Sequence, residues 1–344
     1  MAWSLIHARL HTLLRKRNLL PKHTPILIAV SGGQDSLCLA QLLIDLSPQW
    51  NWSLAIVHCD HRWREDSADN AGHVLKLGQE WNLPTWIETA DHPARTEASA
   101  RAWRYDIVAD LARTEGYTAV VTGHTLSDRA ETVLYNLIRG TGLDGIATLP
   151  WQRPIDEQKP VIQLVRPLLD FYREDTGQFC QQRQLPIWED GTNQDVAFRR
   201  NRVRQELLPY LQEHFNPKVE QALAQLCEIT AADTHYLNEQ TSQLYRQVIT
   251  TSKASDGTPR WGILRQPLNA APLALQRRVI RQLLQQALPK PPNFEQIEKI
   301  IFLLQAPNGS RSDTYPGGLI AEVHRNSINQ KSDFIYLGAP EANT

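Results

Sequence analysis

The chain has 344 residues, and its 36 Lys and Arg residues nearly balance its 37 Asp and Glu residues, giving a formal net charge of −1. This balance excludes a protein that is basic throughout, and the apolar runs are far shorter than the ~20 residues that span a bilayer. The first residues also lack the apolar core of a signal peptide. We therefore expect a cytoplasmic protein with no membrane contact. We also expect two domains, because one hydrophobic core rarely extends beyond ~250 to 300 residues.

The first half of the chain alternates short β-rich runs with helical patterns. Strands are expected at residues 26–30, 53–60, 84–89, 118–124 and 161–168. Helical patterns are expected at about 37–46, 67–82, 97–115 and 127–139. This alternation predicts an α/β fold with a parallel sheet covered by helices on both faces, and with ligands at the carboxyl ends of the strands.

A change of pattern marks the second half. Pro and Asn interrupt the sequence at residues 213–218, where we place a domain boundary. Long helical patterns follow at 217–248, 272–288 and 293–305, and a β-like tail includes 315–324. We therefore expect an α/β domain over residues 1–215 and a smaller, mainly helical domain with a β-like tail over residues 216–344.

The four cysteines are scattered and include no CxxC pair: Cys38, Cys59, Cys180 and Cys227. Their spacing argues against a disulfide framework and against a zinc or iron–sulfur site. We expect buried free thiols.

A glycine turn between the first strand and its helix, "SGGQDS" at residues 31–36, is suited to phosphate. Gly32 and Gly33 permit a tight turn that points backbone N–H groups at an anion, and Ser31 and Ser36 add hydroxyl donors. The loop has no lysine, and a carboxylate beside phosphate is repulsive unless a cation lies between them. Asp35 is therefore a candidate Mg²⁺ ligand, although an acid here also complements the helix dipole and a glycine turn can be purely structural.

Polar side chains also follow the second and third strands. His58 and Asp60 share one face of the second strand, and His58 is expected to line a nucleotide pocket; together with His61 they form too small a cluster for a zinc centre. Arg101 and Arg104 share a face of the helix that begins near residue 96. Arginines on a helix are usually solvated or paired, but a loop without lysine leaves phosphate charge to neutralise, so Arg104 is a candidate functional residue.

The segment "GHTLSDRAETVLYNLIRGTG" (123–142) carries two acids in the first turns of a helix. His124 ends a strand, and Asp128 and Glu131 lie three residues apart on one helix face, at the end that faces the nucleotide. Acids in a first turn are also ordinary complements of the helix dipole.

Motifs in order along the chain carry a resemblance. "SGGQDS" matches the SGGxDS signature of the PP-loop ATP pyrophosphatase superfamily, whose domain is adenine nucleotide alpha hydrolase-like, a Rossmann-like fold. The segment 123–142, "EASARAWRY" (97–105) and "EDGTNQDVAFRRNRVRQELLPYL" (189–211) resemble motifs of the tRNA(Ile)-lysidine synthetase family. Departures from the family pattern include Ser127, where many relatives have an acid, and Arg129, where Gln is common. Gly123 and Thr125 replace the frequent Ala and His on either side of His124.

The resemblance implies an ATP-dependent ligase that forms a carbon–nitrogen bond. ATP would activate C2 of the wobble cytidine of tRNA(Ile) with a CAU anticodon, releasing pyrophosphate, and the ε-amine of L-lysine would then displace AMP. ATP would bind the residues Ser31, Gly32, Gly33, Gln34, Asp35, Ser36, His58 and His124. Lysine would bind Asp128 and Glu131, which with Asp35 and Arg104 form the expected catalytic set. Arg104 would contact either phosphate or the lysine carboxylate.

Transfer RNA requires concentrated positive charge, although arginine clusters are most often solvated. The candidates are Arg199, Arg200, Arg202 and Arg204, with Arg277, Arg278 and Arg281 in the second domain. Two other functions remain open from the residues: a PP-loop tRNA thiolase, for which the cysteines are badly spaced, or a catalytically idle tRNA-binding protein. The chain is expected to act as a monomer or a homodimer.

Overall fold

The computed structural model describes residues 3–63, 65–93, 96–156, 159, 161–189, 191, 199–253, 257–325 and 333–339. The chain divides into two compact units, residues 1–231 and 232–344, and the division falls inside one long helix, α10 (Val219–Val248). The expected boundary at 215/216 lies earlier, in the turn before this helix. No helix in the described part of the chain is both long enough and apolar enough to cross a membrane.

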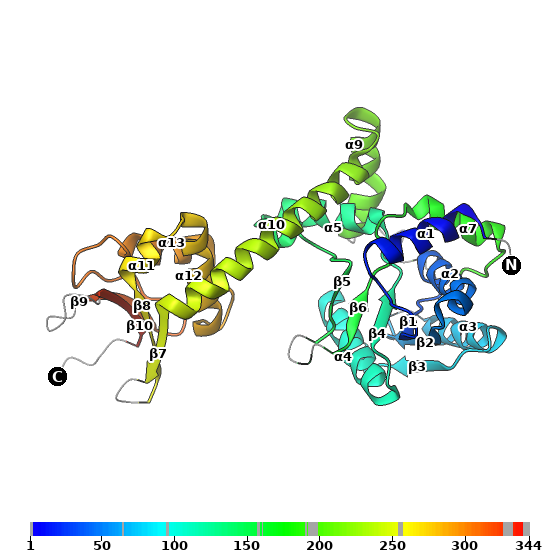
Figure 1. Ribbon diagram of the computed structural model, residues 1–344, viewed down its shortest axis with the longest axis horizontal. Coiled ribbons are helices and arrows are strands. Elements are labelled where there is room, and N and C mark those ends of the chain that lie inside the picture. The colour runs from blue at the N-terminus through cyan, green and yellow to red at the C-terminus, as the bar shows by residue number, and fades with distance from the viewer. Residues whose placement is uncertain are drawn as a thin grey trace. The chain divides into compact units, whose positions relative to one another are not determined.

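The amino-terminal unit contains a six-stranded sheet in the order β3-β2-β1-β4-β6-β5 (Figure 1). Five strands are parallel: β1 (Pro25–Ala29), β2 (Ser53–Asp60), β3 (Thr85–Thr89), β4 (Ala119–Thr122) and β6 (Gln163–Val165). The edge strand β5 (Gln152–Pro154) is antiparallel to β6. The expected α/β fold with a mostly parallel sheet is confirmed.

Helices cover both faces of this sheet. One face packs against α1 (Leu5–Lys16), α2 (Gln34–Trp50), α3 (Ser67–Glu80) and α7 (Arg173–Gln182), and the other against α4 (Glu97–Glu115). Ile26 and Ile28 of β1 lie in the first core and Leu27 lies in the second. Because successive strand side chains point to opposite faces, a strand buried on both faces has a continuous apolar sequence such as "ILIA".

Shorter elements complete this unit beyond the carboxyl end of β4. The helix α5 (Leu126–Arg139) follows that strand, and α6 (Leu143–Ile146) leads toward β5. Later, α8 (Arg199–Arg202), a π-helical turn (Val203–Leu207) and α9 (Leu208–His214) precede α10. Val203 and Leu208 pack on Ala130 of α5 in a small separate core, which places residues 199–208 beside the beginning of α5.

The carboxyl-terminal unit combines helices with a second sheet. Its strands run in the order β7-β8-β10-β9 and are antiparallel: β7 (Ile249–Lys253), β8 (Pro259–Leu264), β10 (Asp333–Gly338) and β9 (Ile320–Arg325). The helices α11 (Arg265–Ala270), α12 (Leu273–Ala287) and α13 (Phe294–Leu303) share one core with this sheet. The expected β-like tail corresponds to β9, whereas β7 and β8 were not expected from the sequence.

Candidate functional site

The glycine turn adopts the conformation that an anion site requires. Gly32 has φ +86°, and a Cβ there would lie 2.4 Å from Asn70 Oδ1, so both the backbone and the space demand glycine. Gly33 is the N-cap of α2, and Ser36 Oγ donates to the Gly33 carbonyl at 2.8 Å and accepts from the Ser31 amide at 3.2 Å. The turn therefore places backbone N–H groups and the positive end of α2 at the carboxyl edge of the sheet.

Asp35 lies at this edge but is held by α7. Its Oδ1 accepts a 2.5 Å hydrogen bond from Thr176 Oγ1, and its Oδ2 lies 3.5 Å from Arg173 Nη1. Gln34 Nε2 donates to Thr176 Oγ1 at 2.8 Å and to the Arg173 carbonyl at 2.7 Å. Burial raises the pKa of Asp35, and Arg173 opposes that rise. No pattern in the sequence predicted α7, so Thr176 and Arg173 were not expected at this site.

The end of β4 approaches the glycine loop closely. A Cβ on Gly123 would lie 2.8 Å from the carbonyl carbon and oxygen of Asp35 and 3.0 Å from the amide nitrogen of Ser36. Glycine at this position therefore lets the end of β4 meet the first turn of α2 without a side chain between them. This approach brings His124 and the first turn of α5 to the phosphate loop.

Asp128 completes the capping box that begins at Thr125, the N-cap of α5, and its other oxygen faces a cation. Its Oδ2 accepts from the Thr125 amide at 2.8 Å in a capping box, and its Oδ1 lies 3.3 Å from Arg204 Nη2. Although burial acts to raise it, the pKa of Asp128 is lowered by the hydrogen bond from the Thr125 amide and by the charge of Arg204. Asp128 is therefore an ionised carboxylate at the centre of the site.

Glu131 is fully buried and forms a bidentate ion pair. Its two oxygens lie 2.5 Å from Arg204 Nε and 2.9 Å from Arg204 Nη2, and its side chain is 1% exposed. Arg200 Nε lies 3.8 Å from the same carboxylate. Burial raises the pKa of Glu131, and Arg204 opposes that rise. Arg204 lies on the π-helical turn, an irregularity that is frequent at functional sites.

The arginine cluster predicted to meet tRNA is thus divided by the structure. Arg200 and Arg204 face the acids of α5, whereas Arg199 is exposed and Arg202 is 58% exposed, with an ion pair to Glu206 at 3.9 Å. Residues 190 and 192–198 of the motif 189–211 lie outside the described residues. Arg199 and Arg202 are therefore the more exposed members of this cluster.

Two residues that depart from the family pattern, Ser127 and Arg129, bind side chains of α10. Ser127 Oγ donates to Glu220 Oε2 at 3.0 Å, so a carboxylate reaches this position from another helix. Arg129 is buried and pairs with Glu228 Oε1 at 2.6 Å. Glu220 was missed because it lies beyond the expected domain boundary, and its only sequence signal was an acid in a first helical turn.

The predicted nucleotide residues of the neighbouring strands are also at the edge. His58 is buried, and its Nδ1 lies 2.8 Å from the Val30 carbonyl oxygen. The Nδ1 of His124 lies 2.9 Å from Thr122 Oγ1, and burial lowers the pKa of His124, so its ring is neutral. Arg104 Nε is buried without a hydrogen-bond partner. Burial and Arg104 together lower the pKa of the neighbouring His61 to about 4.

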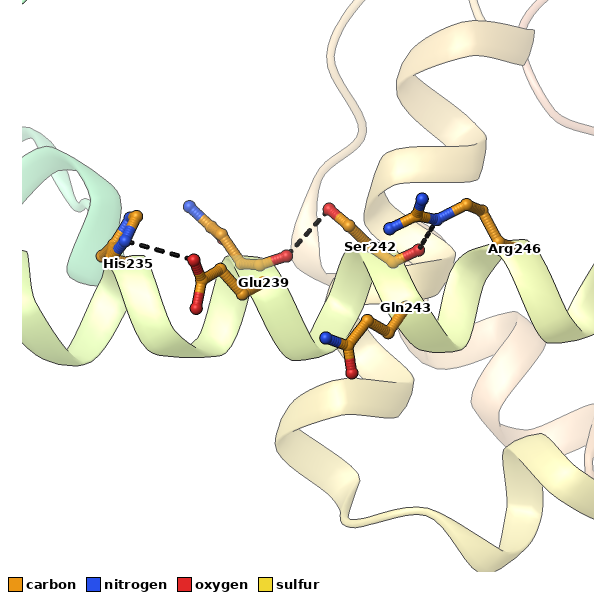
Figure 2. Close-up of a pocket in the computed structure, with 6 residues that line it drawn as sticks. His235, Glu239, Ser242, Gln243 and Arg246 are labelled. Atoms are coloured by element: carbon orange, nitrogen blue, oxygen red, sulfur yellow. Dashed lines mark hydrogen bonds and ion pairs between the residues drawn. The ribbon is translucent and has the colours of Figure 1, made fainter.

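A polar hollow of about 420 Å³ lies along α10 in the carboxyl-terminal unit (Figure 2). Several residues that line this hollow bind one another. His235 Nε2 lies 3.4 Å from Glu239 Oε1, and Arg246 Nε donates to the Ser242 carbonyl at 3.1 Å. It contains none of the predicted site residues. We place the candidate site at the sheet edge of the other unit, where the glycine loop and the perturbed acids lie together.

Comparisons with known proteins identify the family of the chain. A family model described as a PP-loop domain matches residues 4–211, and one described as the TilS substrate binding domain matches residues 265–327. The chain is 52% identical to the tRNA(Ile)-lysidine synthase of Nostoc sp. (strain PCC 7120) over 95% of this chain and 97% of that protein. It is 46% identical to that of Synechocystis sp. (strain PCC 6803) over 98% of this chain and all of the relative.

A solved structure shares the fold. The U34-tRNA thiolase NcsA from Methanococcus maripaludis, described with its 4Fe-4S cluster, superposes with a TM-score of 0.52 at 18% identity, covering 64% of this chain and 78% of that one. At this identity the similarity concerns the fold alone. All four cysteines here are free thiols, as expected, and three are buried.

Proposed function

The chain belongs to the tRNA(Ile)-lysidine synthase family, and we propose that it ligates L-lysine to C2 of the wobble cytidine of CAU-anticodon tRNA(Ile). ATP drives the reaction through an adenylated tRNA, and the products are lysidine, AMP and pyrophosphate. The observation that carries this proposal is the meeting of the glycine loop with the two acids of α5 at one sheet edge. An enzyme that splits ATP and holds an amine needs both groups in one place.

The phosphates of ATP bind the loop Ser31–Ser36, where backbone amides and serine hydroxyls replace the absent lysine. The chain also supplies carboxylates suited to Mg²⁺, because Asp35 lies beside the loop with Asp128 within electrostatic reach. Magnesium sites that bridge phosphates commonly use one or two carboxylates, so this donor set fits. Bound Mg²⁺ would neutralise phosphate charge and favour the departure of pyrophosphate. Arg173 stabilises the Asp35 carboxylate from the other side.

Lysine binds with its ammonium group at Asp128 and Glu131. The amine, with a pKa of ~10.4 in solution, must lose a proton before it attacks C2. Asp128 stays ionised and holds the cation, whereas Glu131, whose pKa is raised by burial, is the better proton acceptor. Arg204 contacts both acids, so it sets their orientation and moderates their charge.

Transfer RNA contacts arginines outside the acid cluster. Arg199 and Arg202 present charge near the beginning of α5, and neutralising both should weaken tRNA binding and reduce its salt dependence. In the carboxyl-terminal unit Arg277 is bound to Glu298 at 2.7 Å, and Arg278 donates to Asn238 at 2.8 Å.

The direct test uses purified full-length protein, ATP, Mg²⁺, labelled L-lysine and transcripts of tRNA(Ile) and elongator tRNA(Met), which share the CAU anticodon. We expect label in the isoleucine transcript alone, with pyrophosphate released in step. Asp35→Ala should abolish both, while Asp110→Ala, which removes an exposed acid from α4, should leave both unchanged. Incorporation that survives Asp35→Ala would refute the assignment of the metal ligand, and absence of label with the wild-type protein would refute the function.

A further inference from the structure

Three guanidinium groups act on one phenol, that of Tyr105, near the carboxyl edge of the sheet. Arg101 of α4 places its Nη2 3.5 Å from the hydroxyl of Tyr105, and its Cζ lies 5.6 Å from the ring centroid. Arg153 of β5 places its Cζ 5.3 Å from the same ring. Burial acts to raise the pKa of Tyr105, whereas Arg101 and Arg166 lower it, and Arg166, directly after β6, is only 1% exposed. We refer to Arg101, Arg153 and Arg166 as the arginine triad.

The triad has no neutralising acid in the described part of the chain. Its other hydrogen bonds go to backbone carbonyls, from Arg153 Nη1 to Pro154 and from Arg166 Nη1 to Pro150, each at 2.8 Å. Arg166 Nε is buried and has no hydrogen-bond partner. Like charges held together with little solvent are mutually destabilising, and a bound oxyanion relieves that repulsion. Guanidinium groups match carboxylate and phosphate in shape as well as in charge.

The triad and Asp128 of α5 both lie close enough to His124 to affect its charge state. Strands β4 and β6 are parallel neighbours with Val121 opposite Val165, so Arg166 emerges beside the end of β4 that leads to His124. Burial lowers the pKa of His124, Asp128 opposes this, and Arg166 and Arg101 add to it. His124 is thus within electrostatic reach of both charged groups.

We propose that the arginine triad binds the α-carboxylate of the lysine substrate while Asp128 and Glu131 hold its reactive amine. An extended lysine separates these two groups by roughly 7 Å, from standard bond lengths. Neighbouring strands are about 4.8 Å apart, so a molecule of this length reaches from one strand end to beyond the next. The triad thereby selects an amino acid over a simple diamine. This inference rests on the proposed function.

An RNA phosphate is the other oxyanion available in the reaction, and the experiment separates the two sources. Cadaverine has the same reactive amine as lysine but lacks the carboxylate. The wild-type enzyme should prefer lysine to cadaverine, and Arg101→Met or Arg153→Met should raise the KM for lysine about tenfold or more. The KM values for cadaverine, ATP and tRNA should not change, so these variants should lose the preference for lysine over cadaverine. Arg113→Met, at the far end of α4, is the matched control.

Two further measurements distinguish the loss of a carboxylate contact from a loss of folding. Arg101→Lys should recover part of the lysine preference, and thermal unfolding should show that the variants remain folded. An unchanged ratio of lysine to cadaverine in active variants overturns the inference alone, as does a rise in the KM for tRNA without a rise for lysine. A wild-type enzyme that uses neither amine overturns the proposed function on which the inference depends.

Discussion

The buried ion pair between Arg129 and Glu228 joins α5 to α10 and permits a quantitative test. Arg129 Nη1 lies 2.6 Å from Glu228 Oε1, its Nη2 donates to the Leu149 carbonyl at 2.9 Å, and its side chain is 4% exposed. Glu228 also binds Arg17 at 3.2 Å and accepts from the Trp151 indole. Removing one partner of a buried pair costs about 3 to 5 kcal/mol, because the other charge stays buried.

The free-energy cost of removing one partner should be smaller for this pair, because Glu228 is 36% exposed and also binds a second cation, Arg17. We expect Glu228→Gln to lower the free energy of unfolding by about 2 to 3 kcal/mol. The double variant with Arg129→Met should be less destabilised than the sum of the single variants, with a coupling energy of about 1.5 kcal/mol or more. Urea denaturation followed by tryptophan fluorescence measures all four proteins.

A surface pair provides the matched control. Arg202 and Glu206 are four residues apart, both more than half exposed, with Nε 3.9 Å from Oε2. The corresponding cycle on this pair should give only about 0.3 to 0.5 kcal/mol. If the Arg129–Glu228 cycle gives a coupling no larger than that of the surface pair, then the view that this contact fastens the beginning of α10 is wrong.

Three other predictions concern the site. Gly32→Ala should lower ATP affinity more than tenfold, because a Cβ would meet Asn70, while Gly116→Ala, with a similar positive φ but no close neighbour, should lower stability alone; nucleotide titration distinguishes them. Asp128 has a lowered pKa in the folded state, so its ionised form stabilises the protein above the usual Asp pKa of ~3.9 and loses this effect as the pH falls through the folded value. The stability difference between wild type and Asp128→Asn should accordingly be constant from pH 7 to about 5 and shrink at lower pH in urea titrations. Glu220→Gln should raise the KM for lysine but not for ATP, since this carboxylate meets the acid cluster through Ser127; equal effects on both would place Glu220 outside lysine binding.

The parts of the site that depend on adjacent residues could be predicted from the sequence. A glycine pair between strand and helix fixes its own geometry, and Thr125 and Asp128 form a capping box within one turn. In contrast, the hydrogen bonds that hold the site's side chains in place join residues far apart in sequence, such as Thr176 with Asp35 and Glu220 with Ser127. These contacts could not be predicted from local sequence. The helix α7 has a mostly polar sequence with an internal glycine, so no periodicity marked it; a Cβ on Gly177 would lie 3.2 Å from Gln34. That glycine is explained by a contact that only the fold creates.

Arginines already satisfy the acids that the proposed reaction needs for its cations. Asp35 pairs with Arg173, and Glu131 with Arg204, so neither carboxylate is left as an uncompensated buried charge. Mg²⁺ and the lysine ammonium would therefore each join or displace a guanidinium group. Both arginines lie on segments other than those that carry the acids, Arg173 at the start of α7 and Arg204 on the π-helical turn. In the proposed reaction, binding of Mg²⁺ or of the lysine ammonium would be coupled to the position of an arginine-bearing segment. This coupling would lower affinity, but it would keep the acids ionised and oriented before the ligands bind.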